Sequence, residues 1–414
     1  MFNIEVLSLV GPKAQKISLA LLVIATLVSL WALRKKPKGL TVAIIVALIL
    51  GFIAWLVLFV IWNPWPGQIP LQIMYVGTLA AFILAALVVR FHWSNVVALV
   101  AVLVGFFGIY NIQFQQYPTV GSLNAEPVTP ELKFEDFKAG KEPKKIRGKN
   151  LGAVVEFPLE GKESHFQTRD AQAYIPPAYW SKPDQKYPLV VLMAGNPGSP
   201  SEWFVSGWAD RAASKYALEH DGVSPIIVSV DATGTYLNNP ICMDTQQYKV
   251  MTYLTKDVPS GIQKTFPINP NRNTWTVGGL SYGGTCSLQV ITEHPEVYRN
   301  FMDFSGEKEP TVGEHKKTVD QYFGGNEQAY QEHNPETLLK REANTGRYRG
   351  INGKFIAGDQ DKLADDALPN LSALSNAAGM KTDYSTVPGS HNYEVWRTAF
   401  GNSFEWLAAR GGLK

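Results

Sequence analysis

Four long apolar stretches without charge constrain this chain more than any other feature of its sequence. They run over about 17–33, 40–62, 71–89 and 96–112. A helix needs roughly 17–25 residues to cross a hydrocarbon core about 30 Å thick, and each stretch approaches or exceeds that length. A charge inside lipid is costly, so the absence of charge is the pattern that lipid selects. We therefore predict a membrane anchor over 1–113 with four transmembrane helices.

The charges divide the chain in the same way. Residues 1–113 hold one acid, Glu5, and seven bases, so +6 of charge falls there and −4 in 114–414, for a net charge of +2. This division excludes a simple soluble enzyme, and it excludes a nucleic-acid binder with a broad basic face. A cleaved signal peptide is the alternative for the first stretch. That stretch ends in Arg34-Lys35-Lys36 rather than in small residues, which disfavours cleavage.

Basic residues beside the stretches predict the orientation. The first and third loops are basic and hold Arg34, Lys35, Lys36, Lys38, Arg90 and His92. The loop at 63–70 has no charge. Positive loops stay in the cytoplasm, which places both termini outside. Lys13 and Lys16 favour the opposite orientation, but they are fewer. We expect a multi-pass protein of the cell membrane.

The simplest interpretation of the predicted bundle is a membrane anchor. No acid, lysine or arginine within its apolar stretches suggests a path for protons or ions. A lipid-binding groove is the alternative. Gly51, Gly77 and Gly105 would permit close approach of the helices.

Residues 114–150 change in character, with several prolines and many charges. We interpret this segment as an exposed extracytoplasmic linker. Its basic run at 141–149 could contact anionic lipid headgroups or could simply be solvated.

From residue 151 to residue 414, short apolar runs alternate with helical patterns. The predicted strands are 153–157, 172–175, 189–193, 225–230, 274–278, 300–304, 354–357 and 384–387. The predicted helices are 208–218, 255–266, 285–293, 364–378 and 393–409. Buried strands that alternate with helices indicate an α/β domain with a mostly parallel sheet and helices on both faces.

A G-x-S-x-G motif at 279–283 follows one of these strands and precedes a helix. This context is that of a nucleophile elbow, where a serine stands on a strained turn between small residues. The motif predicts Ser281 as a catalytic nucleophile. A tight glycine turn with an incidental serine is the alternative.

A serine becomes a good nucleophile only when a base removes its proton. In such folds an acid and then a histidine follow the serine. The strand at 354–357 runs into Asp359 and Asp361, and Asp361 is favoured because it fits a G-x-x-D spacing. His391 alone follows this segment, between the last strand and the last helix. We predict Ser281, Asp361 and His391 as the catalytic residues, with Asp359 as the alternative acid.

The motif also calls for an oxyanion hole made of two backbone N–H groups. One should come from Tyr282, directly after the nucleophile. The other should come from the loop after 189–193, where Pro197 has no N–H and Asn196 is the better donor. An ordinary turn is the alternative for this loop.

The segments 278–284, 358–361 and 388–396 resemble the putative esterase family of α/β-hydrolases, which includes esterase D-like enzymes and mycolyltransferases. The segments 239–244 and 252–259 are similar to an actinobacterial, membrane-anchored branch in which hydrolase domains follow several membrane helices. The resemblance covers about 260 residues.

This resemblance implies acyl-ester hydrolysis or acyl transfer outside the cell, and its motifs match Ser281, Asp361 and His391. The chain departs from the mycolyltransferases, whose acid is a glutamate. Mycolyl transfer itself is therefore not implied.

In such folds Cys242, in the loop after 225–230, neighbours the helix that holds Cys286. Outside the cytoplasm such a pair would oxidise, so we expect a disulfide. Two unrelated buried thiols are the alternative.

The sequence has no H-E-x-x-H motif, C-x-x-C pair or phosphate loop, so we expect no metal and no cofactor. We expect a membrane-anchored serine esterase or acyltransferase with an acyl-ester or lipid-like substrate, the bilayer as partner and no nucleic acid. A non-catalytic envelope protein that binds lipid or a partner is the alternative.

Overall fold

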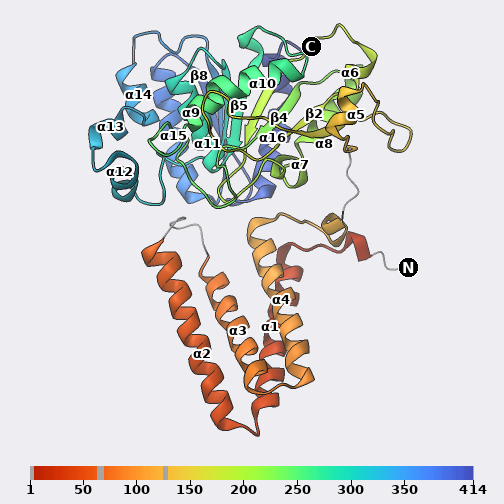
Figure 1. The fold of residues 1–414 in the computed structure, drawn as a ribbon, viewed down its shortest axis with the longest axis vertical. Helices are drawn as coiled ribbons and strands as arrows, with labels where there is room; N and C mark the ends of the chain where they lie inside the picture. The colour runs from red at the N-terminus through yellow and green to blue at the C-terminus, as the bar shows by residue number, and fades with distance from the viewer. Residues whose placement is uncertain (1–3, 63–69, 125–128, 414) are drawn as a thin grey trace. The chain divides into compact units, whose positions relative to one another are not determined.

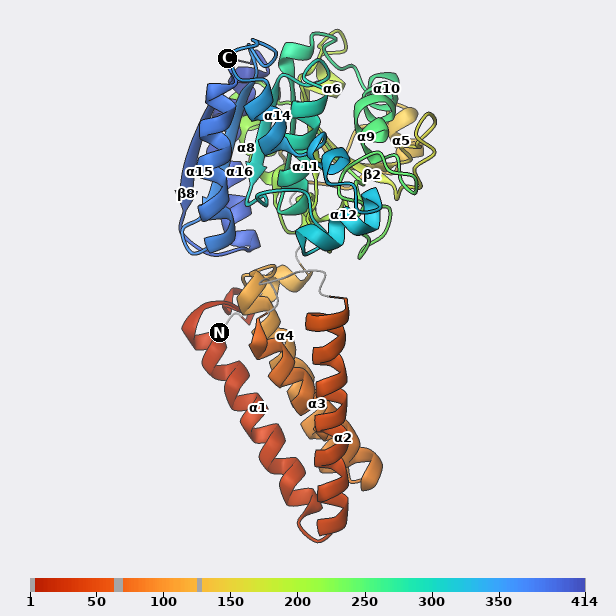
Figure 2. The ribbon, with the colours of Figure 1, turned by 90° about the vertical axis from the view of Figure 1, so that its left-hand side faces the viewer.

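The computed structural model describes residues 4–62, 70–124 and 129–413, which form two compact units over Met1–Ala125 and Glu126–Lys414. Figures 1 and 2 show each unit from two sides. Apart from Pro70, the loop predicted at 63–70 lies outside the described residues.

The N-terminal unit contains four helices that are long and apolar enough to cross a membrane. They are α1 (Gly11–Leu33), α2 (Pro37–Trp55), which continues in a π-helical turn over Leu56–Ile61, α3 (Leu71–Val89) and α4 (Trp93–Phe114). The third matches its predicted bounds. The first begins six residues earlier than predicted and takes in Lys13 and Lys16, because Pro12 in its first turn suits a helix start.

Two of the three glycines expected at helix contacts lie at such contacts. A β-carbon at Gly105 would stand 2.8 Å from a methyl carbon of Leu22 on α1, and one at Gly51 would overlap the Thr78 hydroxyl on α3. The expectation is wrong for Gly77, which faces open space.

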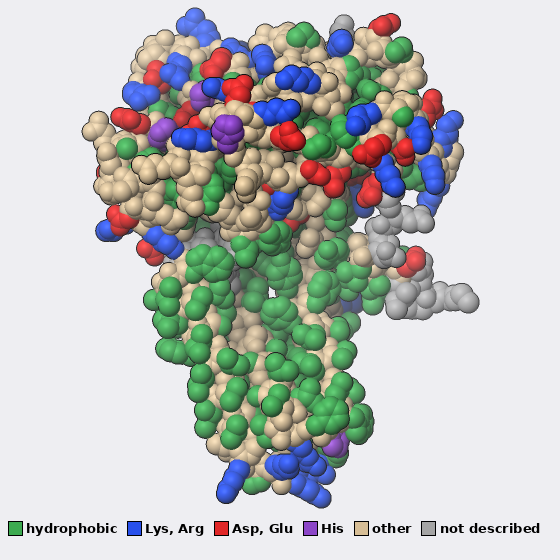
Figure 3. Space-filling view, in the orientation of Figure 1, with side chains coloured by type: hydrophobic (Ala, Val, Ile, Leu, Met, Phe, Trp, Pro, Cys, Tyr) green, Lys and Arg blue, Asp and Glu red, His purple; other side chains and the backbone are tan. Residues whose placement is uncertain are grey.

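Side chains on the outside of the bundle are apolar, as Figure 3 shows, and Val88 is 81% exposed. Lipid favours such a surface.

Basic residues gather at one end of this bundle (Figure 3). There the Arg90 guanidinium donates to the carbonyl oxygen of Ala32, and the rings of Trp31 and His92 lie 6.0 Å apart. At the other end, Leu9 N–H donates to Pro118 O over 2.9 Å. The start of the predicted linker therefore belongs to the N-terminal unit.

The C-terminal unit is built on one eight-stranded sheet. Its strands are β1 (Ala153–Phe157), β2 (Ala171–Ile175), β3 (Leu189–Met193), β4 (Ile226–Val230), β5 (Trp275–Leu280), β6 (Asn300–Phe304), β7 (Asn352–Gly358) and β8 (Lys381–Val387). Their order is β1-β2-β4-β3-β5-β6-β7-β8. The six strands from β4 to β8 in this order pair in parallel, and β1 and β2 form an antiparallel edge. The sheet is mostly parallel, as predicted.

Helices connect the strands. They are α5 (Phe134–Lys138), α6 (Ala178–Ser181), α7 (Glu202–Val205), α8 (Ala209–Glu219), α9 (Val250–Thr252), α10 (Val258–Thr265), α11 (Tyr282–Glu293), α12 (His315–Phe323), α13 (Glu327–Gln331), α14 (Pro335–Arg341), α15 (Lys362–Ala377) and α16 (Tyr393–Arg410). The sequence analysis missed α12 to α14, because that stretch is polar and its helices are short. Asparagine caps start two of them: Asn326 accepts from Ala329 N–H, and Asn334 from Glu336 N–H.

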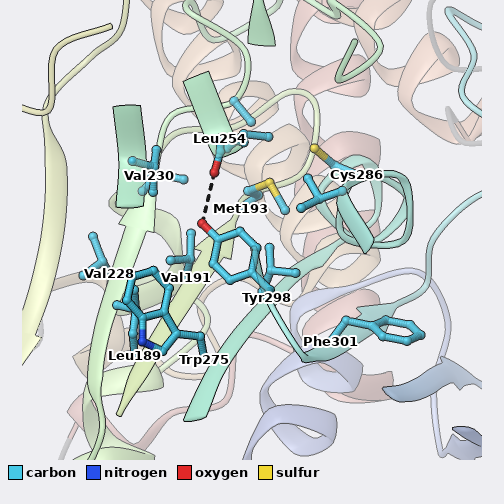
Figure 4. Packing of buried hydrophobic residues seen from close by; sticks show 14 of the residues in the cluster. Leu189, Val191, Met193, Val228, Val230, Leu254, Trp275, Cys286, Tyr298 and Phe301 are labelled. Atoms are coloured by element: carbon cyan, nitrogen blue, oxygen red, sulfur yellow. Dashed lines mark hydrogen bonds between the residues drawn. The ribbon is translucent and has the colours of Figure 1, made fainter. Parts of the chain in front are cut away.

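Helices cover both faces of the sheet. Successive side chains of β3 point to opposite faces, so Leu189 and Val191 join one core and Val190 joins the other. Figure 4 shows part of the first core, where the Tyr298 hydroxyl donates to Leu254 O over 3.0 Å. The second core contains residues of α8 and α16.

The predicted linker also contributes to the C-terminal unit. Val154 N–H donates to Pro130 O over 3.0 Å, so the chain joins the sheet edge at residue 130. Phe137 on α5 is 3% exposed, and its ring lies 5.5 Å from that of Phe266. The expectation of an exposed linker over 114–150 does not hold for these residues, because burial of apolar rings outweighs the preference of the surrounding charges for water.

Candidate active site

Ser281 lies on the sharp turn between β5 and α11. Its backbone has φ 54° and ψ −119°, a conformation that side-chain-bearing residues rarely adopt. A β-carbon at Gly283 would overlap the carbonyl oxygen of Met193, and one at Gly279 would overlap the carbonyl group of Gly283. Small residues are therefore required on both sides of Ser281, and the turn has the geometry of a nucleophile elbow.

Three loops bring Ser281, His391 and Asp361 into one hydrogen-bonded row. His391 Nε2 lies 2.9 Å from Ser281 Oγ, and His391 Nδ1 lies 2.7 Å from Asp361 Oδ2. These loops follow β5, β8 and β7, whose carboxyl ends share one edge of the sheet. Both are hydrogen-bond distances, so His391 can take the proton of Ser281 while the Asp361 carboxylate holds the imidazole in place.

The structure places Asp361, not Asp359, against His391. Burial disfavours the charged carboxylate, but the hydrogen bond and charge of His391 outweigh it, so the pKa of Asp361 lies below its ordinary value. The carboxylate of Asp359 instead accepts from Gly389 N–H over 2.9 Å. Asp361 is thus the ionised partner of the imidazole, and Asp359 supports the loop that carries His391.

Aromatic rings hold His391 from its other side. The Trp396 ring stands perpendicular to the imidazole at 5.1 Å, and the Tyr393 ring lies 4.9 Å from that of Trp396. Asn392 caps the helix that carries both rings by accepting from Val395 N–H. The imidazole is therefore fixed between a carboxylate and an indole edge.

The two residues predicted for an oxyanion hole lie beside the elbow. Tyr282 opens α11, where backbone N–H groups have no partner inside the helix. A β-carbon at Gly195 would lie 3.5 Å from that of Ser281, so the loop that holds Asn196 approaches the nucleophile. The side-chain amide of Asn196 donates to Asn238 O, which fixes this loop to the next one.

A partly buried ion pair also fixes this loop, and no sequence motif predicted it. Arg169 binds Asp231 through two nitrogens, at 2.9 and 2.8 Å, and donates to Gly198 O over 2.9 Å. Burial disfavours the Asp231 carboxylate, but its hydrogen bonds to Arg169 and nearby N–H groups lower its pKa. No motif links these residues, because they are 62 positions apart.

Glu202 is a buried acid beside the site. It is 8% exposed and accepts a hydrogen bond from the Tyr393 hydroxyl, two residues after His391. Burial raises its pKa to about 7, although Tyr393 and Arg169 act in the opposite direction. No motif marks Glu202.

The raised pKa predicts a pH-dependent loss of stability. An unfolded glutamate titrates near pH 4.3, so the stabilisation that belongs to protonated Glu202 is complete below about that pH and is lost as pH rises through about 7. In the wild type, the free energy of unfolding should therefore fall by on the order of 1–3 kcal/mol between pH 5 and 8, and Glu202→Gln should not show this fall. Melting temperatures at both pH values test this, with the exposed Glu219→Gln as control. An unchanged pH slope in Glu202→Gln would refute it.

Cys242 and Cys286 form a disulfide. Their Cα atoms are 5.5 Å apart, and the two residues are separated by 44 positions in the sequence. The bond joins the loop after β4 to α11, which carries the elbow. Closing a loop of this length contributes about 4 kcal/mol in the chain-entropy description.

A cavity of about 700 Å³ lies at the same loop. It is lined by Ser164, His165, Phe166, Gln167, Gly234, Thr235, Asn238, Gln247, Tyr248 and Lys249. Its size suits a ligand.

Among the described residues, no three His, Cys, Asp or Glu side chains are grouped to hold a metal ion.

A mostly parallel sheet with helices on both faces, an elbow serine and a His–Asp pair on later loops define an α/β-hydrolase arrangement. Residues 164–407 match the model of the family described as Putative esterase, and the chain belongs to that family.

The chain is also 44% identical over 418 residues to a protein of Corynebacterium glutamicum named only as an uncharacterized protein, and the match covers 98% of each chain. The match therefore extends over both units of this chain. Two solved structures share the fold of the second unit. A ferulic acid esterase matches with TM-score 0.54 at 18% identity, covering 63% of this chain and 98% of that one. An S-formylglutathione hydrolase from Agrobacterium tumefaciens matches with TM-score 0.51 at 16% identity, covering 62% and 94%.

Proposed function

We propose that this protein is a membrane-anchored serine esterase or acyltransferase that acts on acyl esters of cell-envelope lipids on the extracytoplasmic side. The observation that carries the proposal is the hydrogen-bonded row of Ser281, His391 and Asp361. A serine with a base at 2.9 Å and an acid behind that base is the arrangement that acyl transfer requires.

The proposed reaction has two halves. His391 Nε2 takes the proton of Ser281 as Oγ attacks the ester carbonyl carbon, and the backbone N–H groups of Tyr282 and Asn196 stabilise the resulting oxyanion. The C–O bond to the alcohol then breaks, and His391 returns the proton to the leaving oxygen. An acyl-enzyme on Ser281 remains. Water or an acceptor hydroxyl gives its proton to His391 and attacks the acyl carbon. The bond from that carbon to Ser281 Oγ then breaks, and Oγ takes the proton back from His391 as the acid or new ester leaves. Asp361 stabilises the imidazolium in both halves.

The charges of the N-terminal unit support the anchor and its orientation. Arg34 and Arg90 lie at the same end of the bundle, and positive ends stay in the cytoplasm. The chain leaves the bundle toward the hydrolase domain at the opposite end, after Phe114. The Cys242–Cys286 disulfide is consistent with an oxidising compartment.

A fluorophosphonate probe tests the nucleophile. The full-length protein in detergent should be labelled on the peptide that contains Ser281, and the label should be absent from Ser281→Ala. Failure of the wild-type protein to react would favour a non-catalytic envelope protein that binds lipid or a partner. A labelled acyl donor, supplied with and without a hydroxyl acceptor, separates hydrolysis from transfer by its products.

A further inference from the structure

Large apolar side chains are exposed at few places in the hydrolase domain. Over the described residues 129–413 there are five such side chains, each about half exposed or more: Val205 at 59%, Leu218 at 49%, Tyr236 at 49%, Leu237 at 48% and Leu363 at 57%. Their distribution is uneven, and it follows the edge of the sheet that carries the catalytic row.

Four of the five belong to segments that follow the carboxyl ends of parallel strands. Tyr236 and Leu237 follow β4, Val205 ends α7 after β3, and Leu363 lies in the first turn of α15 after β7. The strands that carry these segments lie on both sides of β5, which ends at Ser281. Leu218 instead lies near the end of α8, which returns from β3 to the start of β4 at the opposite edge.

Contacts tie these segments to the catalytic loops. Gly198 N–H, in the loop beside the elbow, donates to Tyr236 O over 3.1 Å. Leu363 comes two residues after Asp361, which holds His391. We call Val205, Tyr236, Leu237 and Leu363 the apolar rim.

We propose that the apolar rim docks on the surface of the lipid bilayer and inserts its side chains among the lipids, so that the site takes acyl esters directly from the membrane. The proposal rests on the proposed function, because it needs the four apolar helices to lie in that bilayer. Leucine and valine gain by leaving water for the acyl region, and tyrosine favours the headgroup boundary.

The covalent connection keeps lipid within reach. Residue 120 is hydrogen-bonded to the N-terminal segment, and residue 130 is already paired with β1. The six peptide steps from residue 124 to residue 130 span at most about 20 Å. A domain on so short a connection stays close to lipid, which favours the bilayer over a second copy or a soluble partner as the occupant of the rim.

Fluorescence tests the docking without any need for catalysis. Leu237→Cys and Leu363→Cys variants of the full chain are labelled with a polarity-sensitive thiol probe, without reductant so that the native disulfide stays closed. They are then reconstituted into phosphatidylcholine–phosphatidylglycerol vesicles. Brominated acyl chains should quench both probes, and a probe on Leu218→Cys should not be quenched. No quenching at either rim position, or equal quenching at all three, would overturn the proposal.

Activity gives the second readout. Replacing all four rim residues by serine should lower hydrolysis of a long-chain ester embedded in vesicles at least tenfold, while the rate on soluble p-nitrophenyl acetate stays within twofold. Leu218→Ser should change neither rate. A variant that loses both activities, or neither, would contradict the proposal. If the wild-type protein neither hydrolyses an ester nor transfers its acyl group to an added hydroxyl acceptor, the proposed function fails, and the quenching pattern still decides on the rim.

Discussion

Ser281→Ala should lower kcat/KM on a short p-nitrophenyl ester by at least about 10⁴-fold, with little effect on the melting temperature. The hydroxyl at this position lies 2.9 Å from His391 Nε2 at the elbow, and alanine removes the oxygen that forms the acyl-enzyme. The residual activity of Ser281→Ala should reflect oxyanion stabilisation and substrate binding alone. Initial rates of the full-length protein in detergent provide the measurement.

The matched control for this substitution is Ser287→Ala on the same helix. The Ser287 hydroxyl donates to Gly284 O over 2.7 Å and to Met302 O over 3.1 Å, so its loss costs stability without touching the catalytic row. The control should keep at least a third of the wild-type rate. Retention of more than about 1% of activity by Ser281→Ala would remove the proposed mechanism.

Asp361→Asn should lower kcat on the order of 10³–10⁴-fold, whereas Asp359→Asn should stay within about threefold of the wild type. The Asp361 carboxylate accepts from His391 Nδ1, which leaves Nε2 free to take the serine proton. An amide at 361 can donate to Nδ1 and so favours the wrong tautomer. At 359 an amide oxygen can still accept from Gly389 N–H, so the loop should keep its shape.

Comparison of these two variants identifies the acid of the row directly. Both substitutions remove one negative charge within two positions of each other, so a general electrostatic effect would lower both rates alike. A larger loss of kcat in Asp359→Asn than in Asp361→Asn would show that Asp359, and not Asp361, is the acid. Equal, small losses of kcat in both variants would show that Ser281 and His391 act without an acid.

Several features of the chain could be predicted because they depend on local sequence. The apolar stretches specify helices suited to lipid, since each backbone group must find its partner inside its own segment. The elbow is a short-range feature, because Gly279 and Gly283 create room for Ser281 within five residues. The eight strands were predicted as buried apolar runs, and each lies within a few residues of its expected bounds.

Other features could not be predicted because their partners are distant in sequence. Asp359 and Asp361 follow the same strand, so the sequence favoured Asp361 by its spacing alone, and the approach of the loop after β8 is what places it against His391. Glu202 lies 191 positions from Tyr393, whose hydroxyl donates a hydrogen bond to it. The short helices α13 and α14 begin at asparagine caps rather than at any apolar period.

The sequence by itself determined that this chain joins four lipid-suited helices to an α/β domain with a serine on an elbow, because helix length, apolarity and glycine spacing act over a few residues. Only the tertiary structure decided which acid faces His391, which buried charges fix the loop beside Ser281, and where the exposed apolar side chains lie. Those relations arise when parallel strands bring the ends of distant segments to one edge of a sheet, and no local pattern encodes them.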